Sequence, residues 1–294
     1  MPSSTRGAAA SFAVPLPQQV LPAMPPNVYG LIAGSGALPA LLVHNWESHN
    51  ISYYILGFSE QTDPALLTGR PHHIGRLGAV GASLAAFKAA GVTHIVLAGQ
   101  IRRPPLLQLA PDAAGLRLLA RMGVSRGDDG LLKAVVRFLE EEGFGVVGAH
   151  EIIGGVLLPQ RCLTRRQPTK AEHDGIAVGL AALRQLAPLD LGQAVVVAEG
   201  RVLAVEDIGG TDALLERAAG FDYQGQMILI KAAKPGQERR ADMPALGLGT
   251  VQKAAASGFV GIAGTSGETL LLQQDEAISA ANANDLFVCG VPPL

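Results

Sequence analysis

The stretch that decides the fold is VYGLIAGSGALP, residues 28–39. Its first seven residues form a continuous apolar run, which is typical of a strand buried on both faces of a parallel sheet. Glycines then turn the chain, and Pro39 suits the first turn of a helix. Because backbone N–H groups at such a turn can bind phosphate, Gly34, Ser35 and Gly36 are candidate ligand-binding residues.

The same turn is a weak match to a dinucleotide-binding fingerprint. Pro39 stands where the G-x-G-x-x-G pattern has its third glycine. The nearest acid beyond the next predicted strand is Glu60, which comes later than a ribose-binding carboxylate should. A tight turn that binds nothing explains the glycines equally well, so both interpretations stay open.

Strands and helices continue to alternate up to residue 158. We predict strands at 51–57, 92–99 and 144–150, and helices at about 83–90, 113–122 and 127–143. In the last helix Asp128 suits the N-cap and Asp129 the positive end of the helix dipole. This alternation predicts an α/β fold, with a Rossmann-like, mainly parallel sheet domain over residues 27–158.

The second half, residues 159–294, does not show the same regular alternation of strands and helices. A predicted helix at 170–186 precedes two adjacent strands, QAVVVAEG and RVLAVED, whose short connection predicts a hairpin. Further strands and helices follow, so we expect a C-terminal mixed α/β domain. Residues 1–26 are broken by prolines and match a signal peptide poorly, so we predict a disordered tail.

A charged loop, KAAKPGQERRADMPALG (residues 231–247), follows the apolar run QMILI. Its first twelve residues hold two lysines, two arginines, a glutamate and an aspartate, in a chain that is only 16% charged. Cations suit a polyanionic substrate, and acids suit a metal ion or a general base. A solvated surface loop is the alternative interpretation.

Two further segments end predicted strands with polar side chains. Arg102 and Arg103 in AGQIRRPPL stand where open α/β sheets bind ligands, although surface arginines are common. In EDIGGTDALLER, Glu206 is a candidate for a polar site. Thr211 and Asp212 in the same segment can instead cap the next helix.

Composition excludes several classes of protein. A net charge of −2 argues against a general nucleic-acid binder. The sequence contains no run of 18 apolar residues, no G-x-S-x-G and no P-loop motif, and its seven histidines form no ligand pattern. Cys162 and Cys289 lie far apart and make no disulfide framework, which indicates a reducing compartment.

The order of these motifs resembles one family. The resemblance covers residues 28–290 and rests on an ordered set of segments: GLIAGSGALP, AGQIRRP, GDDGLLKAVVRFLEEEGF, GAHEI, LDLGQAVVV, RVLAVEDIGGTDALLERA, KAAKPGQERRADMPALG and GFVGIAG…LFVCG. Together they resemble the LpxI-type UDP-2,3-diacylglucosamine pyrophosphatases of lipid A biosynthesis in Gram-negative bacteria.

The resemblance implies a cytoplasmic, Mg²⁺-dependent hydrolase that holds its ligand between the two domains. Such an enzyme splits UDP-2,3-diacylglucosamine into UMP and 2,3-diacylglucosamine 1-phosphate (lipid X). Peripheral contact with the inner membrane and a homodimer are further expectations. The family's catalytic aspartate falls on Asp242, in ADMPALG. Gly209 stands where similar sequences usually carry Glu, which leaves Glu206 and Asp212 as the nearby carboxylates.

The sequence therefore predicts three sets of site residues. The catalytic set is Asp242, Glu238 and Arg239. The metal-binding set for Mg²⁺ is Asp242, Asp212 and Glu206. The substrate-binding set is Gly34, Ser35, Gly36, Arg102, Arg103, Thr211, Lys231, Lys234 and Gln237. We expect Arg239, Arg240 and the nearby lysines to keep Asp242 ionised. The alternatives are another nucleotide-sugar enzyme, either a transferase or NAD-linked, and a non-catalytic lipid or nucleotide carrier.

Overall fold

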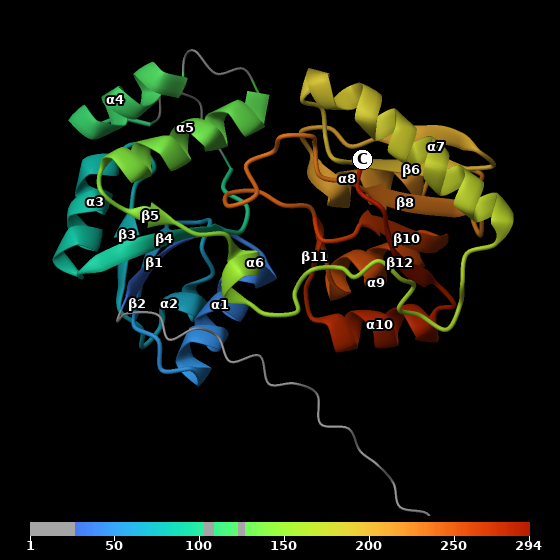
Figure 1. Ribbon diagram of the computed structural model, residues 1–294, viewed down its shortest axis with the longest axis horizontal. Coiled ribbons are helices and arrows are strands. Elements are labelled where there is room, and N and C mark those ends of the chain that lie inside the picture. Colours follow the sequence, from blue (N-terminus) through green and yellow to red (C-terminus); the bar gives the residue numbers. More distant parts are fainter. Residues whose placement is uncertain (1–26, 103–108, 123–126) are drawn as a thin grey trace, which may run out of the picture.

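The computed structural model describes residues 27–102, 109–122 and 127–294. The predicted tail over residues 1–26 and the predicted site residue Arg103 lie outside these ranges. Figure 1 shows two lobes side by side, each with a sheet between helices. Among the helices in the described ranges, none is long and apolar enough to cross a membrane.

The first sheet has five parallel strands in the order β3-β2-β1-β4-β5. They are β1 (Val28–Ala33), β2 (Tyr53–Phe58), β3 (His72–Gly75), β4 (Val92–Ala98) and β5 (Gly145–Val146). All four neighbouring pairs are parallel, which confirms the predicted Rossmann-like arrangement. The strand order reverses between β1 and β4, so the crevice at their carboxyl ends is where such sheets bind ligands.

Helices cover both faces of this sheet, as its doubly apolar strands require. They are α1 (Ala37–Ser48), α2 (Pro64–Leu67), α3 (Val80–Ala89), α4 (Ala113–Met122), α5 (Gly127–Glu141) and α6 (Ala149–Ile152). On one face, Trp46 of α1 packs with Leu31. On the other, Phe87 of α3 and Phe138 of α5 pack with Ile95.

The strand predicted over residues 144–150 is wrong in its second half. The strand β5 ends at Val146, and His150 lies in the short helix α6. The carboxylate of Glu151 accepts the Gly148 N–H at 2.8 Å and so caps this helix. A buried apolar run alone does not distinguish a strand from the start of a helix.

The second sheet is mixed, with strand order β12-β10-β8-β6-β7. Its strands are β6 (Ala194–Ala198), β7 (Arg201–Val205), β8 (Met227–Lys231), β10 (Phe259–Thr265) and β12 (Phe287–Val291). The strands β8, β10 and β12 are parallel, whereas β6 is antiparallel to both of its neighbours. The predicted hairpin is therefore confirmed as β6 and β7, and the start of β6 lies beside the end of β8.

Helices also cover both faces of the second sheet. They are α7 (Lys170–Leu186), the 3-10 helix η2 (Ala187–Leu189), α8 (Gly210–Ala218), α9 (Leu248–Ala256) and α10 (Gln274–Ala283). Ile176 of α7 packs with Val195 and Val197. Val196 points to the opposite face, toward α8, α9 and α10, because side chains alternate along a strand.

The charged loop reaches from the second domain into the first. Its Ala241 packs against the core that α3 and α5 form with the first sheet. Its Met243 packs on the same small cluster as Leu38 and Leu41 of α1. This cluster surrounds a two-stranded parallel sheet made of β9 (Ala245–Leu246) and β11 (Leu270–Leu271). The residues on either side of Asp242 therefore hold it at the boundary between the domains, where the orange loop meets the green helices in Figure 1.

The expectation that Cys162 and Cys289 form no disulfide bond is wrong. Cys162 and Cys289 lie opposite each other in an antiparallel bridge and form a disulfide bond. They are 127 residues apart in sequence, so spacing gave no indication of the contact. The bond ties the segment that enters the second domain to its last strand, β12.

Candidate active site

The charged loop begins with a buried lysine at the end of β8. Lys231 is 5% exposed, and its Nζ donates to Thr211 Oγ1 at 2.8 Å and to the Ala245 carbonyl at 3.0 Å. The pKa of Lys231 lies below its ordinary value, mainly because of burial. The nearby Glu206 and Asp242 carboxylates act in the opposite direction. An ammonium group in such a place is held in a fixed position by its hydrogen bonds.

Glu206 continues this network. Thr211 Oγ1 donates to Glu206 Oε1 at 2.6 Å, and the Gln193 N–H donates to Glu206 Oε2 at 2.7 Å. Thr211 thus connects a buried carboxylate to the lysine and does not cap α8, whose N-cap is Gly209. The prediction that Glu206 belongs to a polar site is consistent with this arrangement.

Asp242 is partly exposed and faces the same network. The side-chain amide of Gln237 donates to Asp242 Oδ2 and also to Gln193 Oε1, the latter at 3.2 Å. Desolvation raises the pKa of Asp242, and the Gln237 hydrogen bond, Lys234 and Lys231 act in the opposite direction. A partly accessible carboxylate with a shifted pKa and fixed neighbours is typical of a functional site.

The two arginines of the charged loop bind other groups of the protein and not Asp242. Arg240 binds both carboxylate oxygens of Glu238, at 2.9 and 2.8 Å, and also Glu140 at 2.7 Å. Arg239 donates to the Gly267 carbonyl. The cations that act on Asp242 are the lysines, and its pKa is raised overall. The expectation that Arg239 and Arg240 help to keep Asp242 ionised is therefore wrong, whereas Lys234 and Lys231 act in the expected direction.

The pairing also separates the roles of the acids in the loop. Arg240 lowers the pKa of Glu238 through its hydrogen bonds. Both oxygens of Glu238 face that guanidinium, so its carboxylate is committed to an ion pair. Asp242 is bound through an amide instead, and it is the acid of the loop that is better placed to act on a substrate.

The predicted metal ligands are only partly brought together. Asp212 pairs with Lys253 at 2.6 Å and is largely exposed. Both oxygens of Glu206 already accept hydrogen bonds. Over the described ranges, no three His, Cys, Asp or Glu side chains gather into a metal-binding group. Asp242, oriented by Gln237, is the carboxylate that fits Mg²⁺ best, since this ion needs only one or two carboxylates besides phosphate oxygens and water.

The glycine loop after β1 packs against the segment after β4. The Ser35 N–H donates to Gln100 O at 2.9 Å, and the Gly34 N–H donates to Ala98 O at 2.8 Å. A Cβ atom on Gly34 would lie 2.4 Å from Gln100 O, so this approach requires glycine. The N–H groups of Gly34 and Ser35 are thus engaged within the protein, contrary to their expected role toward phosphate. Gly36, at φ +98°, stays a predicted ligand-binding residue.

Arg102 follows this bridge and is exposed at the carboxyl end of β4. Its backbone N–H donates to Gln61 Oε1 at 2.6 Å, which fixes the main chain and leaves the guanidinium at the surface. The expected place of Arg102 at the edge of the sheet is correct, and its contact with substrate stays a prediction.

A small cavity of about 140 Å³ opens beside the charged loop. Lys234, Gln237 and Arg239 of the predicted site line it, together with Gly236 and Glu268. Lys234 Nζ pairs with Asp190, which precedes β6. Positive side chains and a glycine backbone at one small cavity suit an anionic group.

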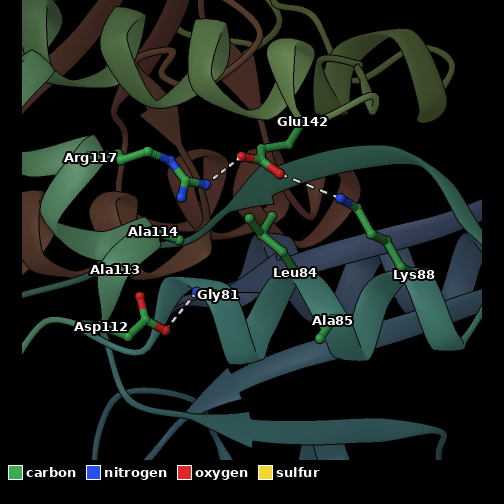
Figure 2. Close-up of a pocket in the computed structure, with 9 residues that line it drawn as sticks. All are labelled: Gly81, Leu84, Ala85, Lys88, Asp112, Ala113, Ala114, Arg117 and Glu142. Carbon is green, nitrogen blue, oxygen red and sulfur yellow. Dashed lines mark hydrogen bonds and ion pairs between the residues drawn. The ribbon is translucent and has the colours of Figure 1, made fainter.

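A larger cavity of about 380 Å³ lies on the first domain, between α3 and α4 (Figure 2). Its charged lining residues are bound to one another or to the backbone. Glu142 accepts from Arg117 at 2.8 Å and from Lys88 at 3.4 Å, and Asp112 accepts the Gly81 N–H at 2.8 Å. None of the predicted site residues lines this cavity. Its charged side chains connect the helices around it to one another.

Comparison with known proteins shows the family of this chain. The model of the LpxI N-terminal domain matches residues 28–156, and that of the LpxI C-terminal domain matches residues 159–289. The chain belongs to the LpxI family. A relative from Caulobacter vibrioides, the UDP-2,3-diacylglucosamine pyrophosphatase LpxI, is 38% identical over 273 residues. These residues cover 90% of this chain and 97% of that LpxI protein, so the predicted resemblance is confirmed.

Sequence reasoning missed Gln193 and Asp190 of the network. Both lie in LDLGQ, just before β6. Because β6 is antiparallel to β8, its first residue pairs with Lys231. The sequence predicted both the hairpin and the buried strand before the charged loop. It did not predict that these strands are neighbours in the sheet, and this pairing is what places LDLGQ beside the charged loop.

Proposed function

We propose that this chain hydrolyses the pyrophosphate bond of UDP-2,3-diacylglucosamine, releasing UMP and lipid X. The observation that carries the proposal is similarity along almost the whole length of a protein of that name. The buried network around Asp242 supports it independently, because pyrophosphate cleavage requires fixed positive groups and a positioned carboxylate.

In the proposed reaction, the domain boundary holds the substrate beside the charged loop. Lys234 and Arg239, at the wall of the 140 Å³ cavity, bind phosphate oxygens. Lys231 is held by Thr211 and Ala245, so its charge is directed at the site without reorganisation. The pyrophosphate thereby lies against Asp242.

Asp242 acts on the attacking water or on a metal ion. Gln237 fixes the rotation of its carboxylate. Mg²⁺, held by Asp242 and substrate phosphate oxygens, would supply positive charge to the developing phosphate oxygens. Burial makes Asp242 more basic than a solvated aspartate, which suits a group that accepts a proton from water attacking the α-phosphate.

We also propose a cytoplasmic location with peripheral contact at the inner-membrane surface. Two acyl chains on the substrate favour a bilayer, since each methylene group contributes about 0.8 kcal/mol when it leaves water. A homodimer stays a prediction.

The experiment is UMP release from UDP-2,3-diacylglucosamine by the purified full chain, in ¹⁸O-water, with Mg²⁺ or with EDTA. We expect multiple turnovers with Mg²⁺, little UMP with EDTA, and the label in UMP. Label in lipid X would place the attack on the other phosphate. Binding of substrate without UMP release would indicate a carrier and contradict the proposal.

A further inference from the structure

The turn that ends in Asp242 is capped from the other domain. Within the charged loop, the Glu238 carbonyl accepts the N–H groups of Ala241 and Asp242, both at 3.0 Å. The N–H of Glu238 itself donates to the carboxylate of Asp129, also at 3.0 Å. Asp129 lies in the first turn of α5 and is separated from Glu238 by 109 residues. One carboxylate of the first domain therefore holds the start of the turn whose last residue is Asp242.

Asp129 makes two further bonds that fix its position. Its other carboxylate oxygen pairs with Lys133 at 2.6 Å, one helical turn along α5. Its backbone N–H donates to Asp190 at 3.4 Å, and Asp190 pairs with Lys234. The start of α5 thus contacts Glu238 directly and is linked to Lys234 through Asp190.

The far end of α5 holds the same turn a second time. Arg240 pairs with Glu140, eleven residues after Asp129, which is about 16 Å along a helix. Ala241 then packs into the core beneath α5. The turn consequently lies along α5, and any shift between the two domains would move Asp242.

We propose that Asp129 is a positioning residue for the reaction proposed above: by accepting the Glu238 N–H, it sets from the first domain where Asp242 stands against the substrate. This inference rests on the proposed function for its kinetic consequence. The geometric part stands without it. Misplacement of a reacting group by about 1 Å can cost on the order of 100-fold in rate while substrate binding survives.

The test compares Asp129→Ala with two matched variants of α5. Asp129→Asn keeps an oxygen that can accept the Glu238 N–H, and Lys133→Met removes only the ion pair. For UMP release, we expect kcat of Asp129→Ala to fall about 10- to 100-fold with KM changed less than about threefold. Asp129→Asn and Lys133→Met should stay within about threefold of the wild type. Should Asp129→Ala not fold, Asp129→Glu replaces it, because its carboxylate stands one methylene further from α5.

A second readout needs no substrate. Amide hydrogen exchange in a peptide covering residues 238–242 should accelerate in Asp129→Ala and stay slow in Asp129→Asn and Lys133→Met. If the wild-type chain releases no UMP, the proposed function fails while the exchange data still decide the role of Asp129. Unchanged exchange in Asp129→Ala, or an equal loss of kcat in Lys133→Met, would overturn the inference.

Discussion

Lys231 Nζ lies 2.8 Å from Thr211 Oγ1, and this contact joins the end of β8 to the first turn of α8. The same hydroxyl donates to Glu206 at 2.6 Å, so Thr211 separates a buried ammonium from a buried carboxylate. A hydroxyl suits this place because it accepts from one group and donates to the other.

Replacing Thr211 by Val should therefore destabilise the protein. The change leaves Lys231 and Glu206 each short of one hydrogen bond in a buried place, at a cost of about 1–3 kcal/mol. Urea unfolding measures the difference. Thr211→Ser keeps the hydroxyl and is the control. A Thr211→Val variant as stable as the wild type, with Thr211→Ser destabilised, would mean that the Thr211 methyl group, and not its hydroxyl, matters.

Asp242→Asn should raise stability at neutral pH. Burial raises the folded-state pKa of Asp242 above its ordinary value of 3.8, so the folded protein binds this proton more tightly than the unfolded chain. The stabilising contribution of the protonated Asp242 carboxyl is therefore present below pH 3.8. It declines as pH rises toward the raised folded pKa and is absent above that pKa. Asn cannot ionise, so its Tm should exceed that of the wild type at pH 7, with a difference that shrinks below pH 3.8. A lower Tm for Asp242→Asn at pH 7 would contradict a destabilising charge.

Asp112→Ala should lower stability by about 1–3 kcal/mol at pH 7. The Asp112 carboxylate accepts the Gly115 N–H and the Gly81 N–H, both at 2.8 Å, and so joins the starts of α4 and α3. Figure 2 shows the contact with Gly81. The Gly115 hydrogen bond is the largest cause that holds the pKa of Asp112 below 3.8. Burial acts in the opposite direction, and the Gly81 hydrogen bond lowers the pKa further. This contribution is present above pH 3.8 and is lost as pH falls through the lowered folded pKa. Denaturant melts at pH 7 and pH 2.5 should show the difference between variant and wild type shrinking; a constant difference would assign it to packing.

The Cys162–Cys289 bond should make thiol counting depend on reductant. Without reductant, the denatured chain should show no free thiol, and after reduction it should show two. Closing a loop of 127 residues typically stabilises a protein by about 2–4 kcal/mol, so the Cys162→Ser, Cys289→Ser double variant should unfold at lower urea. Two free thiols in the unreduced chain would show that the bond does not form in solution.

Sequence patterns predicted most of the fold because its strands are strongly apolar. The run from Val28 onward, the helix at 170–186 with its Thr169 and Glu172 capping box, and the hairpin before β8 all follow local rules. The end of the strand predicted at 144–150 could not be predicted by such rules, because α6 begins inside an apolar run.

The sequence predicted which types of residue the candidate site contains, but not which of their side chains bind one another. Its acids and cations stood out in the charged loop, yet sequence gave no means to see that Arg240 would bind Glu238. The contacts of Asp129 with Glu238 and of Gln193 with Gln237 join residues far apart in sequence. Such pairings depend on strand order and on how the domains meet, which local patterns do not encode.

We propose that Asp242 carries the hydrolysis of UDP-2,3-diacylglucosamine. The direct measurement is single-turnover UMP release by the wild type, Asp242→Ala and Glu238→Gln across a Mg²⁺ titration, with substrate binding measured in parallel. We predict that Asp242→Ala still binds substrate but releases UMP about 10²- to 10⁴-fold more slowly, the range for loss of a positioned acid or base. Glu238→Gln should lose much less, because its carboxylate serves Arg240. Near-normal UMP release by Asp242→Ala, with Glu238→Gln inactive, would contradict the claim and assign the reaction to Glu238.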